Sequence, residues 1–153
     1  MHHAARLAFA AALVAAPASA QQAGDIVVDR AWARATPKGA SVGVGYLTLR
    51  NNGRASDMLT SISSDAAGAV EMHETAMTGA IMRMDTVAAL TIPPGGAIVF
   101  KPGGYHLMFV GLKAPFGKGA RVRATLAFEH AGKIAVDFPV AGVGAAAPDM
   151  DMK

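Results

Sequence analysis

Two side chains that can bind a soft metal ion, His106 and Met108, lie two residues apart in the apolar segment Tyr105–Leu112. This segment follows Lys101–Gly104, whose Pro and Gly residues are typical of a tight turn. Side chains alternate between the two faces of a β-strand, so residues two apart share a face. The sequence therefore predicts a strand that directs an imidazole and a thioether to one side.

Similar donors occur upstream of this strand. Met84 is separated from His73 by ten residues and from His106 by twenty-one, and the chain contains no Cys. Neutral imidazole and thioether ligands suit Cu(I) better than Mg, Ca or Mn, whereas zinc would more often recruit Cys, a third His or a carboxylate. His73, Met84, His106 and Met108 are therefore candidate Cu(I) donors. Because protonated imidazole cannot coordinate, copper affinity should fall as the pH drops through about 6.5, the ordinary pKa of histidine.

Each of these residues also has a structural interpretation. A single His in an apolar strand is more often a hydrogen-bonded core or surface residue than a ligand, and a strand Met usually fills gaps in the core. His73 lies between two acidic neighbours, and Met72 should point to the opposite face of the same strand. Aromatic residues readily fill sandwich interiors, so we expect Trp32, Tyr46 and Phe109 in the core.

The remaining methionines and the third histidine are less informative. Met77 and Met82 are expected to pack in the core, with metal binding as the less favoured alternative. His130 is expected to be a solvated residue of a turn. Met150 and Met152 are spaced so that both thioethers of an extended chain could hold a second copper ion, although a simple flexible tail is the favoured interpretation.

The elements that must position these donors are short strands. Apolar runs are separated by turn signals such as Asn51–Gly53, and helical periodicity is almost absent, which predicts an all-β fold of eight or nine strands with Greek-key connections. The predicted strands are Ile26–Trp32, Val42–Arg50, Asp57–Ser63, Ala69–Thr75, Ala80–Val87, Thr91–Phe100 with an interruption at Pro93–Gly96, Tyr105–Leu112, Ala120–Phe128 and Ile134–Val140. The last two should form a hairpin.

The spacing of the four donors resembles the signature of the PCuAC family of periplasmic copper chaperones. That signature is His, ten residues, Met, twenty-one residues, His, one residue, Met, and residues 73, 84, 106 and 108 match it without insertion or deletion. The segments IPPGG, KPGGYHLM and AWARATPKGASVGVGYLTLRNNG are also similar to the family. The resemblance covers nearly all of the chain after residue 20.

The resemblance implies a single-domain, cupredoxin-like Greek-key β-sandwich that binds one Cu(I) through His73, Met84, His106 and Met108. It further implies delivery of copper towards the CuA centre of cytochrome c oxidase, with the copper subunit of that enzyme and Sco-type thioredoxin-fold proteins as partners. Such a carrier acts by ligand exchange and is not an enzyme.

The N-terminus has the pattern of an export signal. One Arg precedes an apolar stretch, and Ala18–Ala20 is a small-x-small cleavage site, so we expect cleavage after Ala20 and a periplasmic protein. The expected organisation is a signal peptide at 1–20, a copper-binding domain at 21–141 and a flexible tail at 142–153. No later segment is long and apolar enough for stable membrane insertion, and we expect a monomer.

Composition excludes several functions. The net charge of +3 is not gathered into a basic stripe, which argues against nucleic-acid binding. The absence of Cys excludes iron–sulfur clusters, thiol catalysis and blue-copper electron transfer. A monooxygenase with a histidine brace would need His at the mature N-terminus, where Gln21 is expected, and a copper–zinc dismutase needs more histidines. The remaining alternative is a metal-free periplasmic sandwich used for protein contacts.

Overall fold

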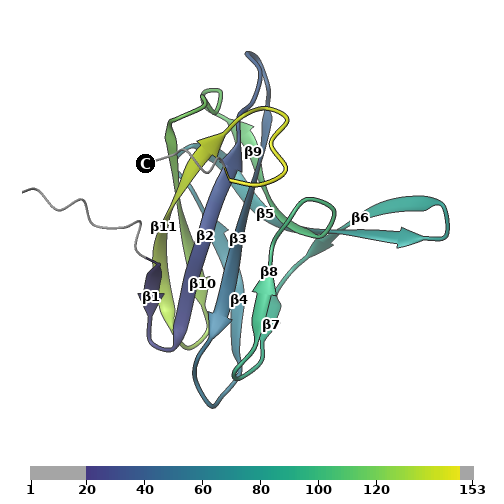
Figure 1. The fold of residues 1–153 in the computed structure, drawn as a ribbon. Helices are drawn as coiled ribbons and strands as arrows, with labels where there is room; N and C mark the ends of the chain where they lie inside the picture. The colour runs from purple at the N-terminus through teal and green to yellow at the C-terminus, as the bar shows by residue number, and fades with distance from the viewer. Residues whose placement is uncertain (1–19, 149–153) are drawn as a thin grey trace, which may run out of the picture.

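The computed structural model describes residues 20–148 and shows only strands, turns and loops in that range (Figure 1). The strands are β1 (Gln21–Ala23), β2 (Ile26–Arg34), β3 (Val42–Asn51), β4 (Asp57–Ser63), β5 (Ala67–Thr78), β6 (Ile81–Val87), β7 (Leu90–Ile92), β8 (Ala97–Val99), β9 (Tyr105–Leu112), β10 (Arg121–Phe128) and β11 (Gly132–Ala141). Between residues 20 and 148, no helix is present that could cross a membrane.

Seven strands close into a flattened barrel in the order β2-β11-β10-β4-β5-β9-β3, with β3 pairing back to β2. Two seams in this ring are narrow: β4 meets β5 at the single pair Ile62–Val70, and β11 meets β2 at two parallel pairs. The barrel can therefore be described as two layers, β2-β3-β9-β5 and β4-β10-β11. The predicted single-domain, cupredoxin-like Greek-key sandwich is confirmed.

The core lies between these layers and is rich in aromatic residues. Phe109 of β9 is fully buried, and its ring meets those of Phe116 and Phe138 edge-on, at centroid distances of 5.3 and 6.0 Å. Trp32 and Tyr46 are also buried, as predicted, and their rings lie 4.6 Å apart. Edge-to-face and tilted arrangements of this kind are favourable for aromatic pairs.

Several strand ends differ from the predicted ones by one to three residues, and three differences change the architecture. A short strand, β1, precedes the first predicted strand and pairs only with β2, and its residues lack the apolar alternation that marks a strand. The predicted strand at 91–100 is divided, because the Pro-Pro-Gly-Gly turn separates β7, which pairs with β4, from β8, which pairs with β3. Finally, β5 continues to Thr78 and forms with β6 an arm that projects from the barrel (Figure 1).

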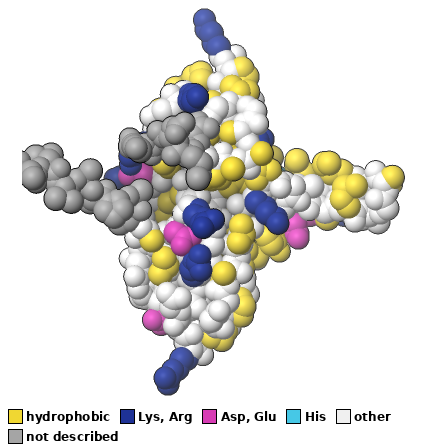
Figure 2. All heavy atoms as spheres, in the orientation of Figure 1, with side chains coloured by type: hydrophobic (Ala, Val, Ile, Leu, Met, Phe, Trp, Pro, Cys, Tyr) yellow, Lys and Arg dark blue, Asp and Glu magenta, His cyan; other side chains and the backbone are white. Residues whose placement is uncertain are grey.

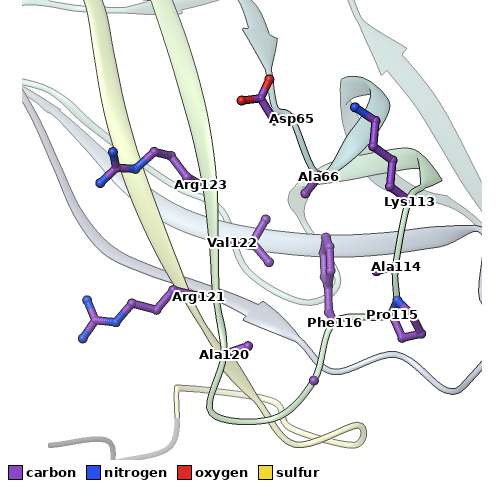
Figure 3. Close-up of a pocket in the computed structure, with 11 residues that line it drawn as sticks. Asp65, Ala66, Lys113, Ala114, Pro115, Phe116, Ala120, Arg121, Val122 and Arg123 are labelled. Carbon is purple, nitrogen blue, oxygen red and sulfur yellow. The ribbon is translucent and has the colours of Figure 1, made fainter.

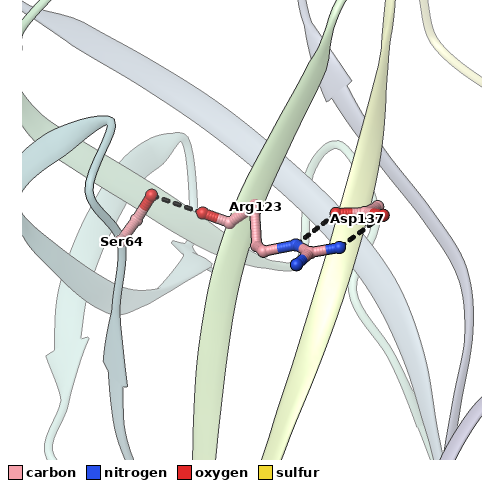
Figure 4. Close-up of polar contacts among 3 residues, drawn as sticks. All are labelled: Ser64, Arg123 and Asp137. Carbon is pink, nitrogen blue, oxygen red and sulfur yellow. Dashed lines mark hydrogen bonds and ion pairs between the residues drawn. The ribbon is translucent and has the colours of Figure 1, made fainter.

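Side-chain hydrogen bonds link the three strands of the smaller layer, β4, β10 and β11. Arg123 of β10 lies opposite Asp137 of β11 and donates two hydrogen bonds to its carboxylate, at 2.9 and 3.2 Å, while the hydroxyl of Ser64 donates to the Arg123 carbonyl at 2.6 Å (Figure 4). The hydrogen bond from Arg123 holds the pKa of the Asp137 carboxyl below its usual value, against the opposing effect of burial. These contacts join β4, β10 and β11 in one unit.

Asp57, at the start of β4, holds the turn between β10 and β11. Its carboxylate accepts hydrogen bonds from the backbone N–H groups of Met58, His130 and Ala131, at 2.7, 2.9 and 2.9 Å. Burial alone would raise the pKa of Asp57, but these three donors outweigh it and the pKa lies below the ordinary value. The ionised carboxylate therefore stabilises the folded protein.

Replacing Asp57 with Asn should lower the free energy of unfolding by about 1–2 kcal/mol at pH 7, because an amide NH₂ would face the N–H of Ala131. A carboxyl whose pKa is depressed by folding stabilises the protein above its unfolded pKa, near 3.9, and loses this contribution as the pH falls through the folded pKa. Urea denaturation of both proteins from pH 7 to pH 3 should thus show the difference shrinking below about pH 4. A difference that stayed constant with pH would contradict this role.

Candidate metal centre

The candidate donors lie on three adjacent strands, β6, β5 and β9, and strand register decides which face each occupies. His73 of β5 is paired directly with His106 of β9. In the same register Glu71 is opposite Met108, and Thr75 is opposite Met84 of β6. Directly paired residues and residues two apart share a face. His73, Met84, His106 and Met108 therefore all lie on one face of this three-stranded sheet.

The opposite face of the same strands belongs to the core. Met72 and Leu107 form the cross-strand pair next to the two histidines, and both are buried in the hydrophobic interior. The expectation that Met72 points away from His73 is confirmed. Because the core packs against one face, it fixes the strands that carry the histidines on the other.

The two imidazoles lie side by side in defined orientations. Their ring centroids are 5.7 Å apart and the ring planes are inclined by 34°. His73 Nε2 lies 2.8 Å from a carboxylate oxygen of Glu71, and His106 Nδ1 lies 3.0 Å from the carbonyl oxygen of Gly104. Carboxylate and carbonyl oxygens only accept hydrogen bonds, so each of these ring nitrogens must carry the proton that it donates.

These hydrogen bonds leave one lone pair on each histidine. Since His73 donates from Nε2 and His106 from Nδ1, the lone pairs are on His73 Nδ1 and His106 Nε2. Both atoms are buried and have no hydrogen-bond partner within residues 20–148. A buried polar atom without a partner costs about 1–3 kcal/mol. Two such nitrogens on paired residues form a site that lacks a positively charged or proton-donating partner.

The two thioethers flank this pair at reachable positions. Met84 and Met108 are each diagonal to His73, and diagonal cross-strand neighbours are about 7–8 Å apart, within reach of a long side chain. Met108 is half-buried, whereas Met84 is 58% exposed. The part of the chain that the structure describes holds no group of three or more His, Cys, Asp or Glu suited to a metal. A metal at this site would therefore need the sulfur atoms.

Glu71 is the site residue that sequence reasoning missed. Its side chain is about half exposed and its carboxylate orients His73 from two residues away on the same face. Carboxylates that accept a hydrogen bond from a ligating histidine fix its tautomer and raise its basicity. The adjacent acidic residue, Glu74, lies on the opposite face, and the alternation of side chains along the strand was the signal that could have distinguished the two.

Two other expectations can be compared with the structure. Met77 and Met82 do not pack in the core: they are 62% and 64% exposed, because they lie on the projecting part of the β5–β6 arm, so that prediction is wrong. His130 has a 67% exposed side chain in the turn between β10 and β11, which confirms its predicted place. Met150 and Met152 lie outside the described residues.

The pentapeptide Gly39–Gly43 matches the Gly-x-Ser-x-Gly pattern of hydrolase nucleophile elbows. That elbow requires a sharp turn from a strand into a helix, with the Ser at its apex. Here Ser41 instead leads into strand β3, and its carbonyl accepts hydrogen bonds from the N–H groups of Gly111 and Leu112. The local structure is that of a strand start.

One hollow of the surface lies away from the histidines. It has a volume of about 390 Å³, and its lining includes Phe116, Lys113, Arg121 and Arg123 (Figure 3). Arg123 is already held by Asp137. None of the candidate donors lines this hollow.

The fold and this face define the chain as a cupredoxin-like β-sandwich with two histidines and two methionines on one face of neighbouring strands. Residues 26–140 match the family described as "Putative lipoprotein LpqE-like", and the chain belongs to that family. It is 33% identical over 129 residues to putative lipoprotein Lxx21020 of Leifsonia xyli subsp. xyli, covering 81% of this chain and 76% of the relative. It is 32% identical over 97 residues to protein RP573 of Rickettsia prowazekii, covering 63% of this chain and 54% of the relative.

Similar solved structures are PCuAC domains and a related protein. The copper-bound PCuAC domain of PmoF2 has a TM-score of 0.71 and 25% identity, over 81% of this chain and 98% of that domain. Apo-DR1885 of Deinococcus radiodurans has a TM-score of 0.61 and 28% identity, over 93% of this chain and 97% of that protein. The Cu(I) form of DR1885 has a TM-score of 0.61 and 27% identity, over 81% of each chain.

Proposed function

We propose that this protein is an exported copper carrier that binds one Cu(I) through His73, Met84, His106 and Met108. The observation that carries the proposal is the pair of adjacent imidazoles, each with a buried ring nitrogen that has no partner. The two thioethers on the same sheet face complete a set of four neutral donors. The proposal is also supported by solved structures similar to this chain, which include a copper-bound PCuAC domain and Cu(I)-DR1885.

The chemistry of the donors favours the cuprous ion. Thioether sulfur and neutral imidazole are soft or borderline ligands, and they suit Cu(I) better than hard divalent ions. The four donors bring no negative charge, so a monovalent cation leaves the smallest net charge to be buried. Glu71 is not one of the four donors, but its carboxylate brings a negative charge close to the site through its hydrogen bond to His73.

The site is suited to ligand exchange. Met84 is more than half exposed, while His106 is 5% exposed, so one side of the site faces solvent and the other is held by the barrel. An incoming thiolate, thioether or imidazole of a partner can replace Met84 first and then draw the ion away.

We propose the copper subunit of cytochrome c oxidase as the destination of the copper and Sco-type proteins as associated partners. We further propose that the protein works as a monomer in the periplasm after removal of residues 1–20.

The alternative function is a metal-free contact module, which the exposed apolar side chains of the β5–β6 arm favour. Met77, Ile81 and Met82 are each more than 60% exposed there. A contact module does not need two buried imidazole nitrogens without partners, whereas a copper carrier does. The carrier is therefore the better explanation of the site.

Anaerobic titration of the purified protein with Cu(I), in competition with a chromogenic Cu(I) chelator, tests the carrier function. We expect the protein to withdraw one tightly bound equivalent from the chelator. His130→Asn is the matched control, because His130 is exposed in a turn remote from the pair, and this variant should also withdraw one equivalent. Failure of the unmodified protein to compete for any copper would favour the contact module.

A further inference from the structure

The sulfur-bearing face continues beyond the four donors, along the β5–β6 arm. Strand β6 pairs only with β5, and its residues from Ile81 to Thr86 are all exposed. Hydrophobic side chains are visible on the projecting arm in Figure 2. Met77 and Met82 are both exposed, so they do not serve the gap-filling role that methionine has in a core. Their exposure requires another explanation.

The hairpin turn sets these two methionines opposite each other. Thr78 is paired with Ile81, so the loop is the two-residue segment Gly79–Ala80, with Gly79 at φ 63° as a type II′ turn requires. This tight loop fixes the register in which Met77 pairs with Met82. Directly opposed residues have Cβ atoms about 4.5–5.5 Å apart. Two flexible thioethers at that separation can reach one ion between them.

Met84 is the third sulfur of this group. It follows Met82 by two residues on the same strand face, at a spacing of about 7 Å. Alternation also places Met77, Met82 and Met84 on the face that carries His73 and His106. A series of soft donors therefore runs from the tip of the arm to the histidines. Met84 lies between the two groups, two residues from Met82 and diagonal to His73.

The charged residues of the arm are kept off this face. Arg83 and Asp85 alternate with the methionines on β6, so they lie on the opposite face, where their side chains form an ion pair at 3.2 Å. On the sulfur face, β6 presents only Met82, Met84 and Thr86. On β6 this face therefore has no carboxylate that would attract hard divalent cations, and no Lys or Arg that would repel a cuprous ion.

From this arrangement we propose a second Cu(I) site formed by Met77 and Met82, with Met84 as its third ligand while the histidine site is empty; it receives the ion before the ion moves to the histidines. The inference rests on the proposed carrier function. The site binds more weakly than the first, because it is exposed and lacks imidazole. Transfer is a ligand exchange without redox change: Cu–S bonds to Met77 and Met82 break as Cu–N bonds to the histidines form, and Met84 is kept throughout.

The test is an anaerobic titration of the full chain with Cu(I), followed by the ¹H and ¹³C signals of the methionine ε-methyl groups. In the unmodified protein we expect the first equivalent to shift Met84 and Met108, and a second to shift Met77 and Met82. In M77L/M82L the first equivalent should bind as before and the second should be lost. Leu conserves volume and apolarity, so this variant removes the sulfur atoms while leaving an apolar surface.

M150L/M152L is the matched control, because it removes the same number of thioethers from the segment outside the described residues. It should retain the second equivalent. If the second equivalent is lost in M150L/M152L and persists in M77L/M82L, the inference is overturned, and the same holds if the unmodified protein takes up only one equivalent. In both cases the first equivalent still binds and the carrier function survives, whereas absence of any uptake overturns both.

Discussion

Replacing His106 with Asn should reduce the affinity for the first Cu(I) at least about 100-fold. Loss of a residue that merely supports a metal ligand costs 10–100-fold in affinity, so loss of a ligand itself should reach or exceed the upper end of that range. The reason is geometric: the lone pair of His106 is on its buried Nε2, and the shorter Asn side chain cannot place a nitrogen at that position. Competition with a chromogenic Cu(I) chelator measures the change.

Controls separate a lost ligand from a lost fold. Because His106 is buried, its replacement could also disturb the fold. A thermal melting curve of H106N with one cooperative transition shows that the variant is still folded. Met108→Leu, which conserves volume while removing sulfur, provides a second variant with less disturbance of packing, and it should also weaken binding. An affinity of H106N equal to that of the unmodified protein would contradict ligation by His106.

Much of the fold could be predicted because its strands carry strong local signals. The segments 57–63 and 105–112 were predicted with the boundaries that the structure shows, since turn residues border an apolar run in both. Strand parity also placed His106 and Met108 on one face before any partner strand was known. Local sequence sufficed in these cases because alternation and turns are properties of a few neighbouring residues.

Other features depend on contacts between distant parts of the chain. That His73 faces His106 follows from the register of β5 with β9, and neither strand contains a local signal for this register. The core prediction for Met77 and Met82 was wrong for a related reason: both lie in a strand pattern, but no other strand covers the arm. The four-residue donor set came from a family resemblance, and spacing alone left the core interpretation of each residue open.

Phe109→Ala should destabilise the folded protein by about 3–5 kcal/mol, the usual cost of removing a fully buried aromatic side chain. Phe109 follows Met108 on β9, and its ring packs edge-on against Phe116 and Phe138, so its loss opens a cavity between the two layers. At about 3–5 °C per kcal/mol for a domain of this size, Tm should fall by about 10–20 °C. Val99→Ala, at an exposed position of β8, is the control and should change stability by less than about 0.5 kcal/mol.

Copper should partly reverse this loss, because Phe109 lies on the core face and the donors lie on the other face of the same strand. A ligand that binds only the folded state stabilises it by about 4 kcal/mol at 1,000 times its dissociation constant, which is close to the expected cost of Phe109→Ala. Excess Cu(I) should therefore restore the Tm of this variant to nearly that of the copper-free parent, while giving little rescue to a protein that carries Phe109→Ala and His106→Asn together. Equal rescue of both proteins would mean that the stabilising copper binds somewhere other than beside His106.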